Sequence, residues 1–506
     1  MKNNTDQRKD SSIGQSVVRN MSVMLSAQVV TWGSSFVLLY FLPRYLGSVD
    51  FGRLYLALSI KMMLGLLIDF GGNYLISKEV ARSEKEGTSI LSSYVILRIL
   101  LWIIAIGLII LFSNILGYSE HVHLLILILA IGKLWEGGYS ALSSYFQGIE
   151  RMEYPSLGKI SEKLFVAIFA IIALLLGADS IGIAIIMTAG ALLNLIVLFS
   201  FSRKVVKINY KFNFKVFGLL HSAMPYFLFS LFSVIYYRVD AVMISAYTTE
   251  SVTGWYGGAF RFFDIVMVLP LIYKTAIFPV FSKLWDNKEG KLEHTVSESM
   301  RLMIILGIPV ALLIFVYAEA IIQFFMGLDE YGPSVLILQI FAISIPFIYI
   351  DIILGSALLS AADRQKSWAT VGLFAIFVNI GINAVLIPYT QANYGNGGIG
   401  AAIATLFTEV FMMISALYLL PGTYLKGFKI AYLLKPIGAS LIMMVAVLAL
   451  LLVNLYWLLA IVLAGVVYVF GLYLMNTFSQ SEIYLLKQFL HIPYIKRFLR
   501  FSKASN

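Results

Sequence analysis

The charged residues most able to do chemistry in this chain lie inside its apolar segments. In the stretch Tyr236–Asp264, Arg238 and Asp240 come near the end of one apolar segment, and Arg261 and Asp264 lie within the next. A charge at membrane depth costs about 2.5–3.5 kcal/mol on insertion scales, so it is expected to face a cavity or a partner. Arg261 and Asp264 are three residues apart and share one helical face, whereas Arg238 and Asp240 are two apart and face different neighbours.

The first half of the chain supplies a second set of buried charges. Lys61 and Asp69 fall in the second apolar segment, Arg98 in the third, and Lys133 and Glu136 in the fourth, where their spacing of three allows them to pair. An excess of buried cations suits an anionic substrate, because arginine matches the geometry of phosphate. Depth therefore makes Arg98, Lys133 and Lys61 candidates for binding such a substrate. The acids that are candidates for ion coupling or charge pairing are Asp69, Glu136, Asp240 and Asp264.

The simpler alternative for each of these residues is a structural ion pair or a long side chain that reaches the membrane interface. This alternative is strongest for Lys274, Glu319 and Asp69, which lie closest to loops, and two further acids, Asp351 and Glu409, lie near segment ends or deeper. The aromatic residues near the charges suit stacking on sugar rings, and their alternative is helix packing or an interfacial belt. They are Trp135, Tyr139, Tyr145, Tyr236, Tyr237, Trp255 and Tyr256.

Composition places the chain in a membrane. Its mean hydropathy is +0.88, and 13% of its residues are charged, against about 25% in soluble domains. The chain has no cysteine, which excludes disulfides, thiolate metal sites and cysteine catalysis. Only His121 and His123 among the five histidines are close together, in a short loop, so we expect no metal site and no cofactor. The net charge of +10 is typical of loop charges in a membrane protein, and we expect no nucleic-acid partner.

Hydropathy predicts an all-α polytopic membrane protein with about fourteen transmembrane helices, because about 20 apolar residues span a bilayer. The predicted segments are 16–41, 54–76, 89–112, 122–147, 159–176, 181–201, 217–247, 253–280, 301–325, 334–360, 367–388, 397–420, 434–453 and 456–476. With the N-terminus inside, 29 of the 37 Lys and Arg residues are cytoplasmic, 2 lie in outer loops and 6 lie within segments. This bias fits the positive-inside rule and predicts that both termini are cytoplasmic, in a multi-pass protein of the plasma membrane.

The segments divide into two similar halves. Ile181-Gly182-Ile183-Ala184-Ile185 opens the sixth segment, and Ile399-Gly400-Ala401-Ala402-Ile403 opens the twelfth, 218 positions later. Glu150-Arg151 and Asp363-Arg364 likewise follow the fourth and tenth segments. We predict a six-helix lobe at 1–201, a basic cytoplasmic linker at 202–216, a second six-helix lobe at 217–425, and two extra helices with a basic tail at 426–506. Parallel repeats of this kind place substrate sites between the halves near the midplane.

Several motifs resemble a known family. Pro43-Arg44-Tyr45-Leu46-Gly47, Phe51-Gly52 and Asp69-Phe70-Gly71 resemble the opening of polysaccharide-biosynthesis flippases, the Wzx-type O-antigen or oligosaccharide-lipid transporters of the multidrug/oligosaccharidyl-lipid/polysaccharide (MOP) superfamily. Pro225 followed by Arg238-Val239-Asp240 resembles the start of their second half, and Tyr256, Arg261, Asp264, Pro279 and Ser282 resemble its continuation. The run from Asn383 through Ile387-Pro388, Gly398–Ala402 and Thr405 to Glu409 resembles their eleventh and twelfth spans.

The resemblance implies a two-lobed MATE-like bundle that moves a polyprenyl-(pyro)phosphate-linked oligosaccharide across the cytoplasmic membrane by alternating access, for cell-surface polysaccharide biosynthesis. Cationic cavity residues of such flippases are thought to hold the pyrophosphate, a role that carries over to Arg238 and Arg261. Membrane lipid surrounds the protein, and a polysaccharide polymerase or a glycosyltransferase is the protein partner that this function implies. In relatives with fourteen spans the extra pair of helices forms a lipid groove.

Three alternatives remain open. An ion-coupled multidrug exporter of the same superfamily would favour buried acids over cations. A membrane-embedded polymerase or glycosyltransferase needs a large outer loop or a catalytic carboxylate motif, whereas every predicted outer loop here is short. A scaffold that transports nothing would not need so many buried charges. No P-loop, Gly-x-Ser-x-Gly or HExxH motif occurs, so we expect a transporter without catalytic activity.

Overall fold

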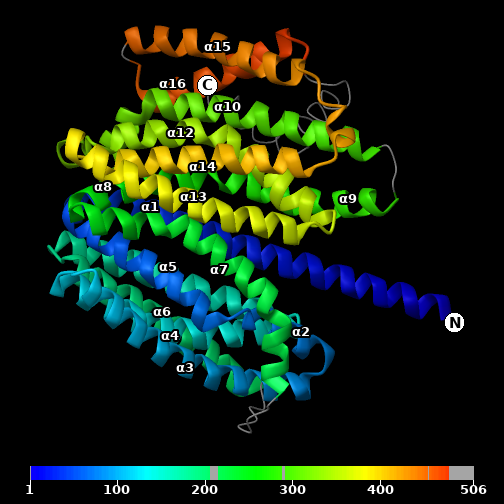
Figure 1. The fold of residues 1–506 in the computed structure, drawn as a ribbon. Coiled ribbons are helices and arrows are strands. Elements are labelled where there is room, and N and C mark those ends of the chain that lie inside the picture. The colour runs from blue at the N-terminus through cyan, green and yellow to red at the C-terminus, as the bar shows by residue number, and fades with distance from the viewer. Residues whose placement is uncertain (1, 206–214, 288–290, 454, 478–506) are drawn as a thin grey trace, which may run out of the picture. The chain divides into compact units, whose positions relative to one another are not determined.

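The computed structural model describes residues 2–205, 215–287, 291–453 and 455–477, and within these ranges it is helical throughout, with no strand (Figure 1). The central part of the predicted basic linker and the basic tail beyond residue 477 lie outside the described residues. The first helices are α1 (Lys2–Asp69), α2 (Gly72–Arg82), α3 (Glu84–Ile115), α4 (Glu120–Gly148), α5 (Glu153–Leu175), α6 (Ser180–Val205), α7 (Lys215–Tyr247) and α8 (Glu250–Val266).

The chain continues through further α-helices, one π-helix and one short 3₁₀ helix. They are α9 (Val268–Asn287), α10 (Lys291–Phe325), α11 (Leu328–Tyr331), α12 (Ser334–Asp351), the π-helix η1 (Ile352–Leu359), α13 (Gln365–Tyr394), α14 (Gly397–Leu419), the 3₁₀ turn η2 (Gly422–Leu425), α15 (Ala431–Leu452) and α16 (Trp457–Leu474). Each of the fourteen predicted segments coincides with helix.

Length and apolarity mark 11 helices of the described part as able to cross a membrane. The first of these, Val23–Arg82, contains two predicted segments, because Gly47 interrupts α1 with φ 72° and ψ 173°, a conformation that only glycine adopts readily. Helices α5 and α7 fall outside this set of eleven but coincide with predicted segments 159–176 and 217–247. The all-α multi-pass membrane fold predicted from hydropathy is therefore confirmed.

Three predicted segments are not continuous α-helices. The second breaks after Asp69, where Phe70 and Gly71 have φ values of 38° and 74°. The eighth is divided between α8 and α9 at Met267. The tenth widens into the π-helix η1 after Asp351. The first break matters most for function, because it places Asp69 at the end of one helix and Asn73 at the start of the next.

Backbone conformation supports the internal repeat. Glu150 and Asp363 both have the left-handed φ of a helix C-terminal cap, 60° and 55°. In both copies the next residue, an arginine, donates its backbone N–H to a carbonyl five residues earlier, at 2.9 Å. Gly177 and Gly395 precede the sixth and twelfth segments and have φ values of 82° and 65°. Matching caps at matching positions are expected of duplicated sequence.

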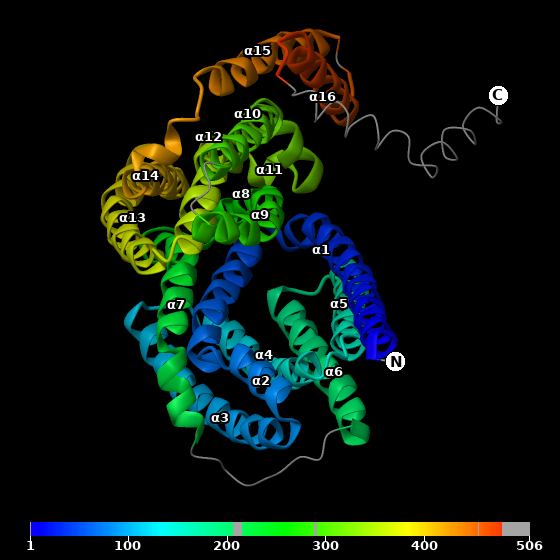
Figure 2. The ribbon, with the colours of Figure 1, turned by 90° about the vertical axis from the view of Figure 1, so that its right-hand side faces the viewer.

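The described helices form two compact units. The first unit comprises residues 1–265, 321–338 and 369–408, and the second comprises 266–320, 339–368 and 409–506. In the first unit α1 lies along α5, and α4 packs against α6 (Figure 2). In the second unit α15 and α16 pack against each other, and α9 packs against η1. The boundaries of the two lobes remain a prediction from sequence.

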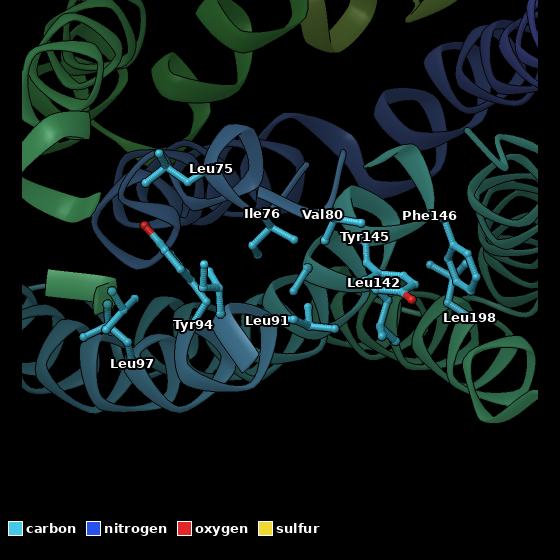
Figure 3. Packing of buried hydrophobic residues seen from close by; sticks show 13 residues of the cluster. Leu75, Ile76, Val80, Leu91, Tyr94, Leu97, Leu142, Tyr145, Phe146 and Leu198 are labelled. Atoms are coloured by element: carbon cyan, nitrogen blue, oxygen red, sulfur yellow. The ribbon is translucent and has the colours of Figure 1, made fainter. Parts of the chain in front are cut away.

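A buried apolar cluster in the first unit holds α2, α3 and α4 together. Figure 3 shows Ile76 and Val80 of α2 on the side toward Leu91 of α3 and Leu142 of α4, and Leu75 of α2 belongs to the same cluster. Burial of such side chains stabilises by about 1.5–3 kcal/mol each in a protein core, although lipid removes part of this drive.

The start of α2 is fixed by its contact with Tyr94 of α3. The ring of Tyr94 lies so close to Gly72 that an added Cβ there would meet ring carbon Cε1 at 1.9 Å. The Tyr94 hydroxyl donates to the carbonyl of Phe70. These two contacts set the position of the polar residues at the break between α1 and α2.

Two glycines allow α1 and α8 to touch. A Cβ on Gly52 would lie 2.0 Å from the carbonyl oxygen of Glu250, and a Cβ on Gly254 would lie 2.0 Å from that of Ser48. Beside them Arg53 donates from Nε to Glu250 at 2.6 Å. The backbones are therefore in direct contact, and any side chain at either glycine must push the helices apart.

Gly52→Ala is expected to lower the free energy of unfolding by about 3 kcal/mol, the upper end of the usual cost of overpacking, because this contact is backbone to backbone. Thermal unfolding in detergent measures the effect. The matched control is Gly107→Ala in α3, where nothing lies within 4 Å of the added Cβ. An unfolding temperature for Gly52→Ala equal to that of Gly107→Ala would contradict the close contact.

Candidate functional site

The first polar cluster joins α1, α3 and α4 of the first unit. The carboxylate of Glu136 forms ion pairs with Nζ of Lys61 and with Nζ of Lys133, the latter at 3.2 Å. Lys133 lies 3.5 Å from Asp69, which in turn lies 3.2 Å from Nη2 of Arg98. Three cations thus alternate with two carboxylates in one network. The pairing of Lys133 with Glu136 that their spacing predicts is confirmed.

Arg98 is the most deeply buried member of this network, with 2% of its surface exposed. Its Nη1 donates to the carbonyl of Gly137 at 2.6 Å and to Ser140 at 3.1 Å, and its Nη2 donates to Asn73 at 2.7 Å. The Nε atom is buried and has no hydrogen-bond partner among the described residues. Arg98 therefore anchors α3 to α2 and α4, and its remaining donor is Nε.

A cavity of about 630 Å³ lies beside Arg98, between α3, α4 and α6. Its lining is almost entirely apolar, with Trp135, Leu142 and Phe199 among the large residues. The lysines of the network are more accessible than Arg98: 13% of the Lys61 side chain and 15% of the Lys133 side chain are exposed. These two ammonium groups are the members of the first cluster best placed to exchange a carboxylate for another anion.

A second cluster joins α1, α7 and α8. Nη2 of Arg238 lies 3.6 Å from Oδ2 of Asp264, and 46% of the Asp264 side chain is exposed. The guanidinium of Arg238 lies 5.4 Å from the ring centre of Phe260, and that of Arg261 lies 4.9 Å from the ring centre of Phe51. Such stacking of a cation on an aromatic face stabilises by about 0.5–2 kcal/mol. Arg261 also interacts electrostatically with Asp264, as their shared helical face predicts.

Asp240 is in no described ion pair with Arg238 or Arg261. Its carboxylate accepts hydrogen bonds from Tyr256 at 2.7 Å, from Asn383 at 2.7 Å and from Thr405 at 2.9 Å. The Asn383 amide also donates to Asn379 at 2.9 Å, while its own carbonyl oxygen has no partner among the described residues. Helices α7, α8, α13 and α14 thus gather side-chain oxygens around one buried carboxylate that has no cation paired to it in any described ion pair.

Sequence reasoning found the charged residues of these clusters but missed their neutral partners. Asn73 and Asn379 were not singled out, although an asparagine inside an apolar segment is itself a signal of a buried polar contact. Among the aromatic candidates, Tyr145 and Tyr256 are fully buried and take part in packing and hydrogen bonding. Trp255 donates to the carbonyl of Glu330. No group of three or more metal-ligating side chains occurs in the described ranges.

The fold and the buried ion pairs together define a class: an all-helical multi-pass membrane protein with charged clusters among its helices. The family model described as polysaccharide biosynthesis protein matches residues 17–285, and the MatE model matches residues 225–385. The first match covers more than half of the chain. The chain therefore belongs to the polysaccharide biosynthesis protein family.

Curated relatives agree with this placement. The chain is 24% identical over 397 residues to the probable low-salt glycan biosynthesis flippase Agl15 of Haloferax volcanii, a match that covers 77% of this chain and 80% of that protein. It is 25% identical over 281 residues to the succinoglycan biosynthesis transport protein ExoT of Rhizobium meliloti, covering 55% and 56% of the two chains.

Two solved structures share the fold. The lipid II flippase MurJ in an inward closed conformation matches with a TM-score of 0.70 at 18% identity, over 90% of this chain and 98% of its own. An inward-facing multidrug resistance MATE family transporter of the MOP superfamily matches with a TM-score of 0.63 at 15% identity, over 77% of this chain and 94% of its own. At these identities the likeness concerns the fold.

Proposed function

We propose that this protein is a flippase that translocates a polyprenyl-(pyro)phosphate-linked oligosaccharide across the cytoplasmic membrane for cell-surface polysaccharide biosynthesis. The observation that carries the proposal is the arrangement of five cations along one face of α1. The α1 residues that contact a cation are at positions 51, 55, 65 and 69, and position 61 is itself a lysine. These five positions lie within an arc of about 120° on an α-helix.

The cations follow α1 in order. Arg261 stacks on Phe51, and Arg238 interacts with Tyr55. Lys61 is itself on α1. Nζ of Lys133 lies against Gly65, where an added Cβ would come within 2.7 Å of it, and Arg98 pairs with Asp69. From position 51 to position 69 the helix rises about 27 Å, close to the bilayer core of about 30 Å.

The charge along this face is positive. Five cations meet Asp69, Glu136 and Asp264 in the described ion pairs and electrostatic contacts, and a fourth carboxylate, Asp240, interacts with Tyr55, so the excess is one cation. A phosphate that enters can displace a carboxylate from one cation at a time, because each exchange replaces one charge-assisted hydrogen bond with another. Exchange between neighbouring pairs avoids leaving the phosphate unpaired at membrane depth, which would be costly.

The alternative function is an ion-coupled multidrug exporter, since a multidrug transporter shares the fold. The excess of cations on the α1 face favours an anionic substrate over cationic drugs. Two other relatives of this chain are named for glycan flipping or polysaccharide transport. We therefore place the lipid-linked glycan first and keep drug export as the second candidate.

The proposal extends to orientation, coupling and partners. We place both termini in the cytoplasm, because 29 of 37 Lys and Arg residues then lie inside. Asp240 with its oxygen-rich surroundings is the proposed coupling-ion residue, since hard cations prefer oxygen ligands. The protein acts as a transporter and not as an enzyme, and it works beside a polysaccharide polymerase or glycosyltransferase.

Deleting the gene in its own host tests the function. The proposal expects loss of a surface polysaccharide and accumulation of its lipid-linked precursor on the cytoplasmic side, both restored by the wild-type gene. A drug-susceptibility panel in a host that lacks its own pumps serves as the comparison. Unchanged surface polysaccharide together with raised drug resistance would replace the proposal with the exporter.

A further inference from the structure

The cavity of about 630 Å³ beside Arg98 has no role in the function proposed above. Helix α4 packs against both α3 and α6 and lies between them in Figure 1 and in Figure 2. Its adjacent residues Gly137 and Gly138 line the cavity without side chains. The cavity thus has α4 as its floor and α3 and α6 as its walls.

The cavity opens toward lipid. Four residues of its lining are exposed at the surface of α3 or α6: Ile96, Ile99, Ile196 and Phe199. Both helices are long and apolar enough to cross a membrane, so their exposed apolar side chains lie against hydrocarbon. These helices belong to the first unit, whereas the extra pair α15 and α16 belongs to the second. The cavity is therefore distinct from any lipid groove that the extra pair forms.

A hydrocarbon chain is the occupant that suits this space. A buried water needs about 2–4 polar partners, and the lining is almost entirely apolar. The hydroxyl of Ser92 in the lining already donates to the carbonyl of Thr88 at 3.1 Å. An empty apolar cavity loses packing contacts over its whole lining, at a cost that grows with its volume. The volume of this cavity lies within the usual range of ligand pockets, about 300–1,000 Å³.

The cavity adjoins positive charge. Arg98 is part of the lining, and its Nε is the one buried side-chain donor of the lining that has no partner among the described residues. Ile68 lines both this cavity and a small space of about 10 Å³ that Lys61 and Lys133 also border. The ion-pair network of these three cations contains two carboxylates, so it carries one net positive charge. An anion joined directly to a hydrocarbon chain matches both features.

We propose that the first isoprene units of the substrate's polyprenyl chain bind in this cavity while Lys61, Lys133 and Arg98 hold its phosphate. The inference rests on the proposed function and adds the place where the chain lies. In a polyprenyl phosphate the charged group is joined to the end of the chain, so a phosphate at the network brings the chain to the cavity beside Ile68. A phospholipid chain would leave the positive charge uncompensated, because glycerol separates it from its phosphate.

Photocrosslinking of the purified full-length protein tests the proposal without any transport. The probe is a polyprenyl phosphate with a diazirine in its second isoprene unit, and peptide mass spectrometry locates the label. The label is expected on residues 91–99 of α3, 134–142 of α4 and 195–199 of α6. Unlabelled polyprenyl phosphate is expected to compete at least about tenfold more strongly than polyprenol, since one charge-assisted hydrogen bond to phosphate contributes about that factor or more.

Two variants fill the cavity from opposite walls. Ile99→Trp on α3 and Ile196→Trp on α6 are each expected to lose most of the label, because the indole occupies the space of the chain. Both positions are exposed, and thermal unfolding verifies folding. Ile103→Trp, one turn further along α3 at an exposed position outside the lining, is the matched control and should keep the label.

Labelling of both filled variants equal to the wild type, a label only outside α3, α4 and α6, or equal competition by polyprenol would overturn the proposal. Equal competition by phosphatidylglycerol would also overturn it and assign the cavity to an ordinary membrane lipid. The result is separable from that of gene deletion. Loss of surface polysaccharide without label in the cavity would refute this site and leave the flippase, whereas a labelled cavity with unchanged polysaccharide would refute the flippase and leave a polyprenyl-phosphate site.

Discussion

Replacing Arg238 and Arg261 together by glutamine is expected to reduce glycan translocation by at least about 100-fold while the protein still inserts and folds. Each arginine would supply a charge-assisted hydrogen bond to phosphate worth about 1.5–3 kcal/mol, and every 1.4 kcal/mol is a factor of ten. The measurement is surface polysaccharide in a deletion strain that carries the variant, with membrane-inserted protein quantified in parallel.

A charge-balanced variant separates binding from structural pairing. Arg238→Gln combined with Asp264→Asn removes both members of the pair described above, so a merely structural role predicts recovery of transport. The phosphate-binding role predicts that transport stays low. Arg203→Gln at the end of α6, where the arginine is exposed and stacks on Phe199, is the control cation outside the α1 face. Normal transport in the double arginine variant would refute the assignment of both residues.

Asp240→Ala is expected to destabilise the protein by about 2–6 kcal/mol, because it removes the acceptor of the buried Tyr256 hydroxyl and of one buried Asn383 N–H, whereas Thr405 still donates to the carbonyl of Ala401. Each unsatisfied buried group costs about 1–3 kcal/mol. Asp240→Asn keeps a carbonyl oxygen in place and is expected to cost much less. Thermal unfolding in detergent, followed by tryptophan fluorescence, measures both.

The same pair of variants tests ion binding. If Asp240 binds the coupling ion, adding Na⁺ or lowering the pH stabilises the wild type, since a ligand that binds only the folded state raises its stability. Asp240→Asn should lose that response although it remains folded. An ion response of equal size in wild type and Asp240→Asn would assign the ion to another site.

Much of the membrane fold follows from local sequence. Apolar runs of about 20 residues mark helices wherever they occur in lipid, because backbone groups must be satisfied within the segment. The pairing of Lys133 with Glu136 also follows from spacing alone, since a helix fixes which side chains share a face.

Contacts between helices could not be predicted in this way. Asp69 pairs with Arg98 across 29 positions of sequence, and it does so because the backbone turns at Phe70 and Gly71. Asparagines such as Asn73 complete the network only once α2 has packed on α3. The widening of α12 into η1 has no composition signal that hydropathy detects. Such features depend on tertiary packing, which overrides local propensity.

The central claim is that the cations along α1 carry a phosphorylated lipid across the membrane. Its most direct test is reconstitution of the purified protein in liposomes that contain a fluorescent polyprenyl-pyrophosphate-linked sugar, with transbilayer movement followed by an impermeant quencher. The account predicts rapid movement with the wild type, and movement at the protein-free rate with Arg238→Gln/Arg261→Gln. Equal rates for the wild type and this variant, or no movement above protein-free liposomes, would contradict it.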